Sequence, residues 1–124
     1  MLALIDINET HQLPRVVLNA EKGYGLFQGN SFASNSHSFY LPIFNWLETY
    51  STSPCTTTIL EFKLEYINSS SSKSISKILS IIKTFLDKSN VHIKWYYKRD
   101  DDDIKDMGEE YAYFLGLTFE YIEY

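Results

Sequence analysis

The segment TTTILEFKLEYINSSSSKSISKILSIIKTFLDKSN, residues 56–90, decides the fold of this chain. In its first part, apolar and charged residues alternate from Leu60 to Tyr66, which predicts a strand with one buried face and one wet face. In its second part, apolar residues recur at three- and four-residue steps, which is typical of an amphipathic helix. These residues are Ile75, Ile78, Leu79, Ile82, Phe85 and Leu86. A strand that leads directly into a helix indicates a β-α-β unit and a parallel sheet.

The same alternation of strand and helix continues toward the C-terminus. Residues 91–98, VHIKWYYK, have the strand period, and residues 99–116 have helical spacing. The aspartates Asp100 to Asp103 suit the positive end of that helix, and Gly116 is a suitable cap for its other end. We expect its buried face to contain Ile104, Met107, Gly108, Tyr111, Phe114 and Leu115. Residues 117–124, LTFEYIEY, then predict a last strand.

Toward the N-terminus, residues 15–20 and 24–30 predict a β-hairpin whose turn contains Gly23. The first dozen residues have no clear periodicity, and we expect a loose lead-in there. Residues 31–51 carry a helical stripe, in which Trp46 lies off the main apolar face and could be either a core residue or an exposed anchor.

The predicted element order is therefore β-β-α-β-α-β-α-β, within a single domain of residues 1–124. Strands that alternate with helices imply right-handed crossovers and a mixed, largely parallel sheet of the α/β class. Because the strands alternate instead of being continuously apolar, we expect helices mainly on one face.

The bulk composition argues against several classes of function. The formal net charge is −5, whereas a general nucleic-acid binder, or a protein drawn to an anionic membrane, needs clustered cations. No segment approaches the roughly 20 apolar residues that cross a bilayer, and the first residues do not resemble a signal peptide. Cys55 is the single cysteine, which fits a reducing compartment. We expect a cytoplasmic protein with neither nucleic-acid nor membrane partners.

Residue types that carry out catalysis or bind metals are scattered. Asp100 to Asp103 lack the glycine and the spaced ligands of a calcium loop, so a solvated helix start is the better interpretation. The histidines lie far apart in the sequence, at His11, His37 and His92, and none has the spacing of a metal site. Nothing beside Cys55 would activate its thiol. The sequence predicts no catalytic residue, no metal and no cofactor.

Hydroxyl side chains are concentrated at one junction. The strand ends and the next helix begins within four consecutive serines, Ser69 to Ser72, which follow Asn68. A helix start has about four unpaired N–H groups and a partial positive charge, so it can accommodate a phosphate of roughly −1.5 to −2 charges. The alternative interpretation is that these serines only cap the helix and form a loop.

Three blocks of sequence resemble the SiaC family of regulatory phosphoproteins. They are residues 29–36 (GNSFASNS) with 44–48 (FNWLE), residues 64–71 (LEYINSSS), and residues 93–97 (IKWYY). The second block is also similar to the strand–helix junction of STAS-type anti-sigma-factor antagonists, in which a phosphorylatable Ser or Thr follows Asp or Asn. The resemblance implies a STAS-like fold.

The resemblance to the SiaC family implies a partner switch without an active site of its own. A serine/threonine protein kinase phosphorylates the hydroxyl residue after the Asn, and a metal-dependent protein phosphatase removes the phosphate. The unmodified form binds an output protein, in the known case a diguanylate cyclase that it activates. The target maps to Ser69, with Ser70 and Ser71 as alternatives because the serine run blurs the register. Family members can carry Thr at this position.

We expect the partner-binding surface to combine two loops at one edge of the sheet. One loop precedes the first long helix and the other begins the second, and the residues in question are Asn30, Asn35, Ser36, Asn68, Ser69, Ser70 and Lys73. The asparagines and Ser36 could equally serve only as caps. Two other functions remain open: a constitutive scaffold whose serines are never modified, and a small enzyme with a pocket near Asn30 and Ser69.

Overall fold

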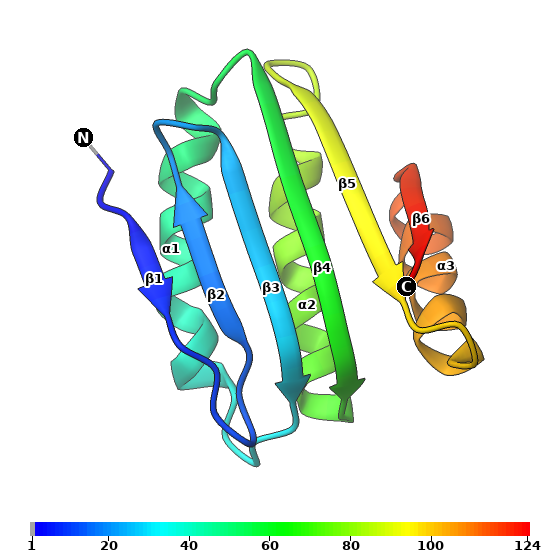
Figure 1. Ribbon diagram of the computed structural model, residues 1–124. Coiled ribbons are helices and arrows are strands. Elements are labelled where there is room, and N and C mark those ends of the chain that lie inside the picture. The colour runs from blue at the N-terminus through cyan, green and yellow to red at the C-terminus, as the bar shows by residue number, and fades with distance from the viewer. Residues whose placement is uncertain (1) are drawn as a thin grey trace.

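The computed structural model describes residues 2–124, which form a six-stranded sheet with three helices on one of its faces (Figure 1). The elements are β1 (Ile5–Ile7), β2 (Arg15–Asn19), β3 (Tyr24–Ser31), α1 (His37–Thr52), β4 (Thr57–Ile67), α2 (Ser69–Lys83), β5 (Asn90–Tyr97), α3 (Asp102–Leu115) and β6 (Phe119–Glu123). The strands lie in the sheet in chain order. The first three pair antiparallel, and β3 to β6 are parallel. The prediction of a mixed, largely parallel α/β sheet is confirmed.

The helices share one face because the chain adds each parallel strand on the same side of the previous one. Right-handed crossovers in a constant direction place α1, α2 and α3 behind the sheet, as Figure 1 shows. The other face meets solvent, and β4 shows the result: Leu60, Phe62 and Leu64 are buried, whereas Glu61 and Lys63 lie on the open face. The C-terminal ends of β3 and β4 therefore meet the starts of α1 and α2 at one edge of the sheet.

Aromatic rings connect the parallel strands through the core. Phe27, Phe62, Trp95 and Phe119, which come from β3, β4, β5 and β6, stack in sequence with centroid distances of 4.9, 5.7 and 5.6 Å. Trp95 is fully buried and donates its indole N–H to the carbonyl of Ile104 at 2.9 Å. This ladder fixes α3 against the sheet beside the predicted site.

The expectation of a loose lead-in is wrong for Ile5–Ile7. These residues form β1, which pairs antiparallel with β2 through Ile5 and Leu18 and through Ile7 and Val16. A strand of three residues is too short to show a period, and pairing with its neighbour fixes it instead. The lead-in segment also touches α1, because Trp46 donates its indole N–H to the carbonyl of Ala3. Trp46 is buried and is a core residue.

Three residues predicted to be buried are exposed. Tyr66 is 57% exposed because the register slips between β3 and β4: Gly29 faces Leu64, but Asn30 faces Tyr66. This β-bulge reverses the alternation at the end of β4. Leu86 lies beyond the end of α2 and is 42% exposed, and Phe114 on α3 is 79% exposed. The hairpin at Gly23 and the αL cap at Gly116 are as predicted.

Candidate functional site

The junction between β4 and α2 is held at Asn68, the N-cap of α2. Its side-chain oxygen accepts from the backbone N–H of Ser71 at 2.9 Å, and its own backbone N–H donates to the carbonyl of Ser31 at 3.1 Å. The first bond satisfies one of the N–H groups that a helix start leaves unpaired. The second joins the junction to the end of β3. Asn68 therefore fixes the position of the following serines relative to two strands.

The four serines after Asn68 occupy different environments. Ser71 is fully buried, and its hydroxyl accepts from the hydroxyl of Ser31 at 2.7 Å. Ser31 is in turn bonded to the phenolic oxygen of Tyr40 on α1 at 2.7 Å. Ser70 is exposed, but its hydroxyl lies 3.0 Å from that of Ser36, the N-cap residue of α1. The starts of α1 and α2 are thus joined through hydroxyl contacts.

Ser72 turns toward α3. Its hydroxyl lies 2.7 Å from the phenolic oxygen of Tyr111, which also donates to the carbonyl of Ser72 at 3.1 Å. Ser69, the first residue of α2, is exposed. Within residues 2–124, Ser69 is the one serine of the run whose hydroxyl has no hydrogen-bond partner. The fold therefore presents one unengaged hydroxyl at the helix start.

The electrostatics of this helix start favour an anion. The first turn of α2 contains no acidic residue, whereas α3 has Asp102 and Asp103 in its first turn. The positive end of the α2 dipole is therefore not offset by carboxylates of its own first turn. Lys73, one helical turn beyond Ser69, is exposed and adds a positive charge on the same side.

Other predicted partner-binding residues surround the junction. Asn30 lies at the end of β3, opposite Tyr66, and Asn35 is exposed in the loop before α1. Neither makes a side-chain hydrogen bond to the junction within residues 2–124. Ser36 is buried and makes the contact with Ser70 described above. The structure thus joins Ser36, Asn68 and Ser70, and places the two asparagines beside them at the same edge.

The sequence did not reveal the partners of the serines. Tyr111 was predicted to lie on the buried face of its helix, and Tyr40 lies in the predicted helical segment 31–51, but their hydroxyls bond Ser72 and Ser31. Burial raises the pKa of Tyr40 to about 12 and also raises the pKa of Tyr111, so both phenols stay protonated at neutral pH. Phe32 and the exposed Tyr66 pack edge to face at 5.6 Å next to the junction. The helical period predicted the burial of the tyrosines but carried no signal for these pairings.

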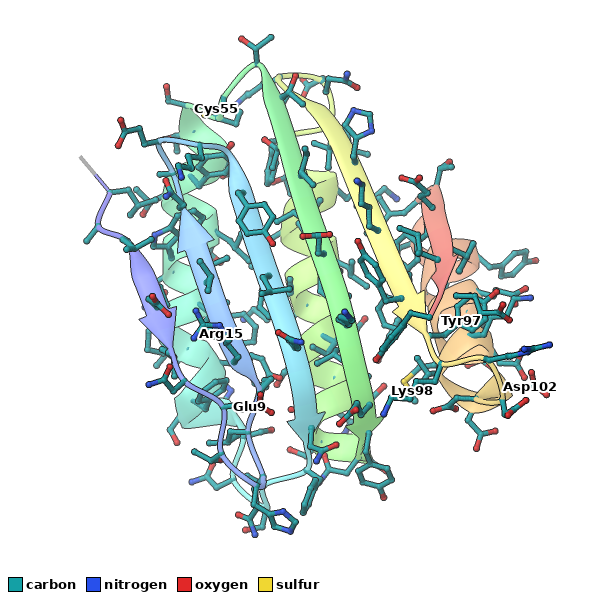
Figure 2. The ribbon with its side chains drawn as sticks, in the orientation of Figure 1. Glu9, Arg15, Cys55, Tyr97, Lys98 and Asp102 are labelled. Atoms are coloured by element: carbon teal, nitrogen blue, oxygen red, sulfur yellow. The ribbon has the colours of Figure 1, made fainter. Side chains whose placement is uncertain are left out.

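Candidates for catalysis lie elsewhere. Cys55 lies before the start of β4 (Figure 2), whereas Ser69 follows the other end of this strand. The thiol of Cys55 donates to the carbonyl of Ala20 at 3.1 Å. Across residues 2–124, no group of three His, Cys, Asp or Glu side chains is arranged to hold a metal. Asp101 instead caps α3 by accepting from the N–H of Ile104. Within residues 2–124, no His, Cys, Asp or Glu side chain makes a hydrogen bond to the hydroxyl of Ser69.

The sequence model of the SiaC family, described as regulatory phosphoproteins, matches residues 7–124. This chain belongs to the SiaC family. A relative, an uncharacterized protein of Pseudomonas aeruginosa strain UCBPP-PA14, is 24% identical over 116 residues, which cover 93% of this chain and 92% of the relative. The resemblance of the three sequence blocks is confirmed.

Solved structures show the same SiaC fold. The crystal structure of apo-SiaC from Pseudomonas aeruginosa matches with a TM-score of 0.85, covering 97% of this chain and 98% of that chain. A chain in the crystal structure of diguanylate cyclase SiaD in complex with its activator SiaC, from the same organism, matches with a TM-score of 0.87, covering 97% of this chain and 99% of that one. Both are 22% identical to this chain. The matches are to SiaC structures, and the STAS-like description stays a prediction.

Proposed function

We propose that this member of the SiaC family is a partner-switching regulator controlled by phosphorylation of Ser69. Its unphosphorylated form binds and regulates an output protein, and a serine/threonine kinase and a metal-dependent phosphatase set its state. The observation that carries the proposal is the exposed, unengaged hydroxyl of Ser69 at the start of α2. The family's description as regulatory phosphoproteins supports it.

The surroundings of the other serines favour Ser69 as the target. Ser71 is fully buried, so a phosphate there would need local unfolding and the burial of a dianion. The hydroxyl of Ser70 is accessible but already contacts Ser36. A phosphate on Ser69 breaks no side-chain hydrogen bond of the described chain, meets the positive end of α2 and lies one turn from Lys73. The modification therefore changes the surface while the fold stays intact.

The switch acts by electrostatic exclusion. An output protein that packs over phosphorylated Ser69 would have to strip water from the phosphate or place its own groups against the negative charge. Either way, the effective penalty on the binding free energy is several kcal/mol for a buried ion. Because about 1.4 kcal/mol corresponds to a tenfold change in affinity, this penalty abolishes binding without a change of fold. The positive helix start recovers only about 0.3–1 kcal/mol.

A diguanylate cyclase is the proposed output. The support is the structural likeness to a chain in a complex of the cyclase SiaD with its activator SiaC. The regulator itself has no active site in this proposal, because the polar residues of the junction bond one another instead of converging on a cleft. We propose a cytoplasmic location, where kinase, phosphatase and cyclase would all have access to Ser69. Among residues 2–124, no helix is long and apolar enough to cross a membrane.

Mass spectrometry of the protein purified from its native cells tests the proposal. The intact mass is measured with and without phosphatase treatment, and the peptide that contains the serine run is then sequenced. We expect one phosphate, on Ser69. A phosphate on Ser70 would support regulation by phosphorylation but assign the modified residue to Ser70. A protein that is unmodified in every growth state would favour a constitutive scaffold.

Binding measurements then separate the switch from the scaffold. We expect Ser69→Ala to retain the output protein and Ser69→Asp to lose it in a pull-down from the same cells. Ser80→Asp is the matched control, because Ser80 is exposed on the same helix and lies three turns further along. Equal retention by all three variants would contradict the exclusion mechanism.

A further inference from the structure

Helix α3 exposes two neighbouring aromatic side chains. Tyr113 is 82% exposed and Phe114 is 79% exposed, and their rings meet edge to face at 5.4 Å. The buried stripe of this helix consists of Ile104, Gly108 and Tyr111. Because successive helical residues lie about 100° apart around the axis, Tyr113 stands opposite this stripe and Phe114 stands on its flank. Adjacent large apolar side chains in water mark an interaction surface more often than a single exposed residue does. We call Tyr113 and Phe114 the aromatic ridge.

Phe114, one of the two ridge residues, lies between two hollows of the surface. One lies between α2 and α3, and its walls are Ser72, Lys73, Ser76, Glu110, Tyr111, Phe114 and Leu115. The other is lined by Glu109, Glu110, Tyr113, Phe114 and Tyr121. Phe114 and Glu110 belong to both hollows, which places them between the two. Side chains of a partner could therefore enter on either side of the Phe114 ring.

The hollow between α2 and α3 is continuous with the serine junction. Ser69, Ser72 and Ser76 are spaced by three and four residues, so they lie on one face of α2. Ser72 lines the hollow and bonds Tyr111 across it. A molecule that fills this hollow would reach to within one helical turn of Ser69.

The charges beside the ridge define the chemistry of the partner. Asp106, Glu109 and Glu110 are exposed on α3, and the C-terminal half of this helix, after Lys105, carries no basic residue. A second copy of the chain docked by the same patch would bring these carboxylates together, and like charges at an interface cost several kcal/mol. Nucleic acid and anionic lipid would be repelled for the same reason. A segment with apolar and basic side chains matches both the rings and the carboxylates.

We propose that the aromatic ridge and the α2–α3 hollow bind an amphipathic helix of the output protein. The apolar residues of that helix pack on Tyr113 and Phe114, and its Lys or Arg residues lie opposite Glu109 and Glu110. A hollow between two helices suits a helix, whose anchors recur every three to four residues. The inference rests on the proposed function for one point, which is that an output protein binds the unphosphorylated form. It adds where that protein binds and what its binding segment consists of.

Photo-crosslinking in native cells tests the docking surface. The full chain carries Ser69→Ala and has p-benzoylphenylalanine in place of Tyr113 or of Phe114. The matched control has the same group in place of Leu86, which is exposed just beyond the C-terminal end of α2, far from Ser69. We expect a higher adduct yield at both ridge positions than at the control. The cross-linked peptide, sequenced by mass spectrometry, should come from another protein and combine basic residues with helically spaced apolar ones.

Three outcomes would overturn this inference: a ridge yield no higher than the Leu86 yield, a linked peptide from a second copy of this chain, or a linked peptide without basic residues. Charge reversal adds an independent arm. We expect Glu109→Lys combined with Glu110→Lys to lower the ridge adduct about tenfold. Glu21→Lys, at the exposed hairpin turn of the other sheet end, should leave it unchanged. Equal yields in the two variants would also contradict the inference.

The state of Ser69 distinguishes failure of the docking surface from failure of the switch. If the ridge adduct forms equally in Ser69→Ala and Ser69→Asp, the docking surface stands and the switch is refuted. If a pull-down responds to these substitutions while the ridge gives no adduct, the switch stands and the docking surface is refuted.

Discussion

The buried hydroxyl chain beneath the proposed phosphorylation site allows a prediction with a definite sign. Ser31 donates to Ser71, so its single proton is used and Tyr40 must donate to Ser31. Ser31, Ser71 and Tyr40 are all fully buried. Ser31→Ala removes both hydrogen bonds and leaves the phenol of Tyr40 buried without a partner. Adding Tyr40→Phe removes that unpaired phenol, so we expect the second substitution to restore stability in the first variant.

The magnitudes follow from the number of bonds. A typical intramolecular hydrogen bond contributes about 1 kcal/mol, and an unpaired buried group costs about 1–3 kcal/mol. We expect Ser31→Ala to lose about 3 kcal/mol or more of unfolding free energy, because two bonds are lost and the phenol is left unpaired, and Tyr40→Phe alone to lose about 1 kcal/mol. The double variant lacks both bonds but has no unpaired phenol, so it should lose only about 2 kcal/mol, about 2 kcal/mol less than the sum. Each kcal/mol corresponds to about 4 °C in Tm.

Urea denaturation followed by circular dichroism measures these differences. Tyr113→Phe is the matched control, because Tyr113 is exposed and its hydroxyl has no hydrogen-bond partner within residues 2–124. The control should unfold like the parent protein. A double variant that loses the sum of the single losses would refute the reasoning, because additivity would mean that Tyr40 and Ser31 are not bonded.

Three further predictions concern other parts of the molecule. Gly108→Ala should destabilise the fold by about 1 kcal/mol in urea unfolding, because the added Cβ would lie 2.5 Å from the indole nitrogen of the buried Trp95. This clash outweighs the better helix propensity of Ala. An increase in stability would contradict the packing of Gly108 against Trp95. Ser69→Asp should raise the free energy of unfolding by about 0.3–1 kcal/mol in thermal unfolding, because a negative charge is favourable at the N-terminus of α2. A lower free energy of unfolding in this variant would argue against a helix start that accommodates phosphate. Glu61→Gln should lower the pKa of Tyr96 from about 12 toward its ordinary value of 10.0, because the hydrogen bond to the Glu61 carboxylate, together with burial, raises it. Because the pKa of Tyr96 is raised in the folded state, its contribution to stability is present below about pH 10 and is lost as the pH rises toward 12. NMR titration with ring-labelled tyrosine measures this pKa, and an unchanged value in Glu61→Gln would contradict the pairing of Tyr96 with Glu61.

Much of the fold was predictable because its elements have clear periods. The alternation from Leu60 to Leu64 and the stripe from Ile75 to Ile82 predicted β4 and α2, and both are buried where expected. The hairpin turn at Gly23 followed from a glycine that adopts φ of 61°. These features depend on neighbours within one element, which a single sequence displays directly.

The candidate site was predictable only in outline. The run of hydroxyls after Asn68 marked the junction, and the resemblance to the SiaC family selected Ser69 from it. Which serine has an exposed and unengaged hydroxyl was not readable from the sequence, since Ser70 and Ser71 are of the same type as Ser69. Their environments come from residues 34 and 40 positions away in the chain, Ser36 and Ser31.

The sequence by itself determined the order of strands and helices after residue 15 and the position of the serine junction, because local periodicity and capping residues define both. The tertiary structure alone decided the pairing of β1, the bulge that turns Tyr66 outward, and the exposure of Phe114. The physical reason is the range of the interactions. A period shows which residues of an element share a face, but strand register and helix packing decide which face is covered, and these depend on contacts between distant parts of the chain.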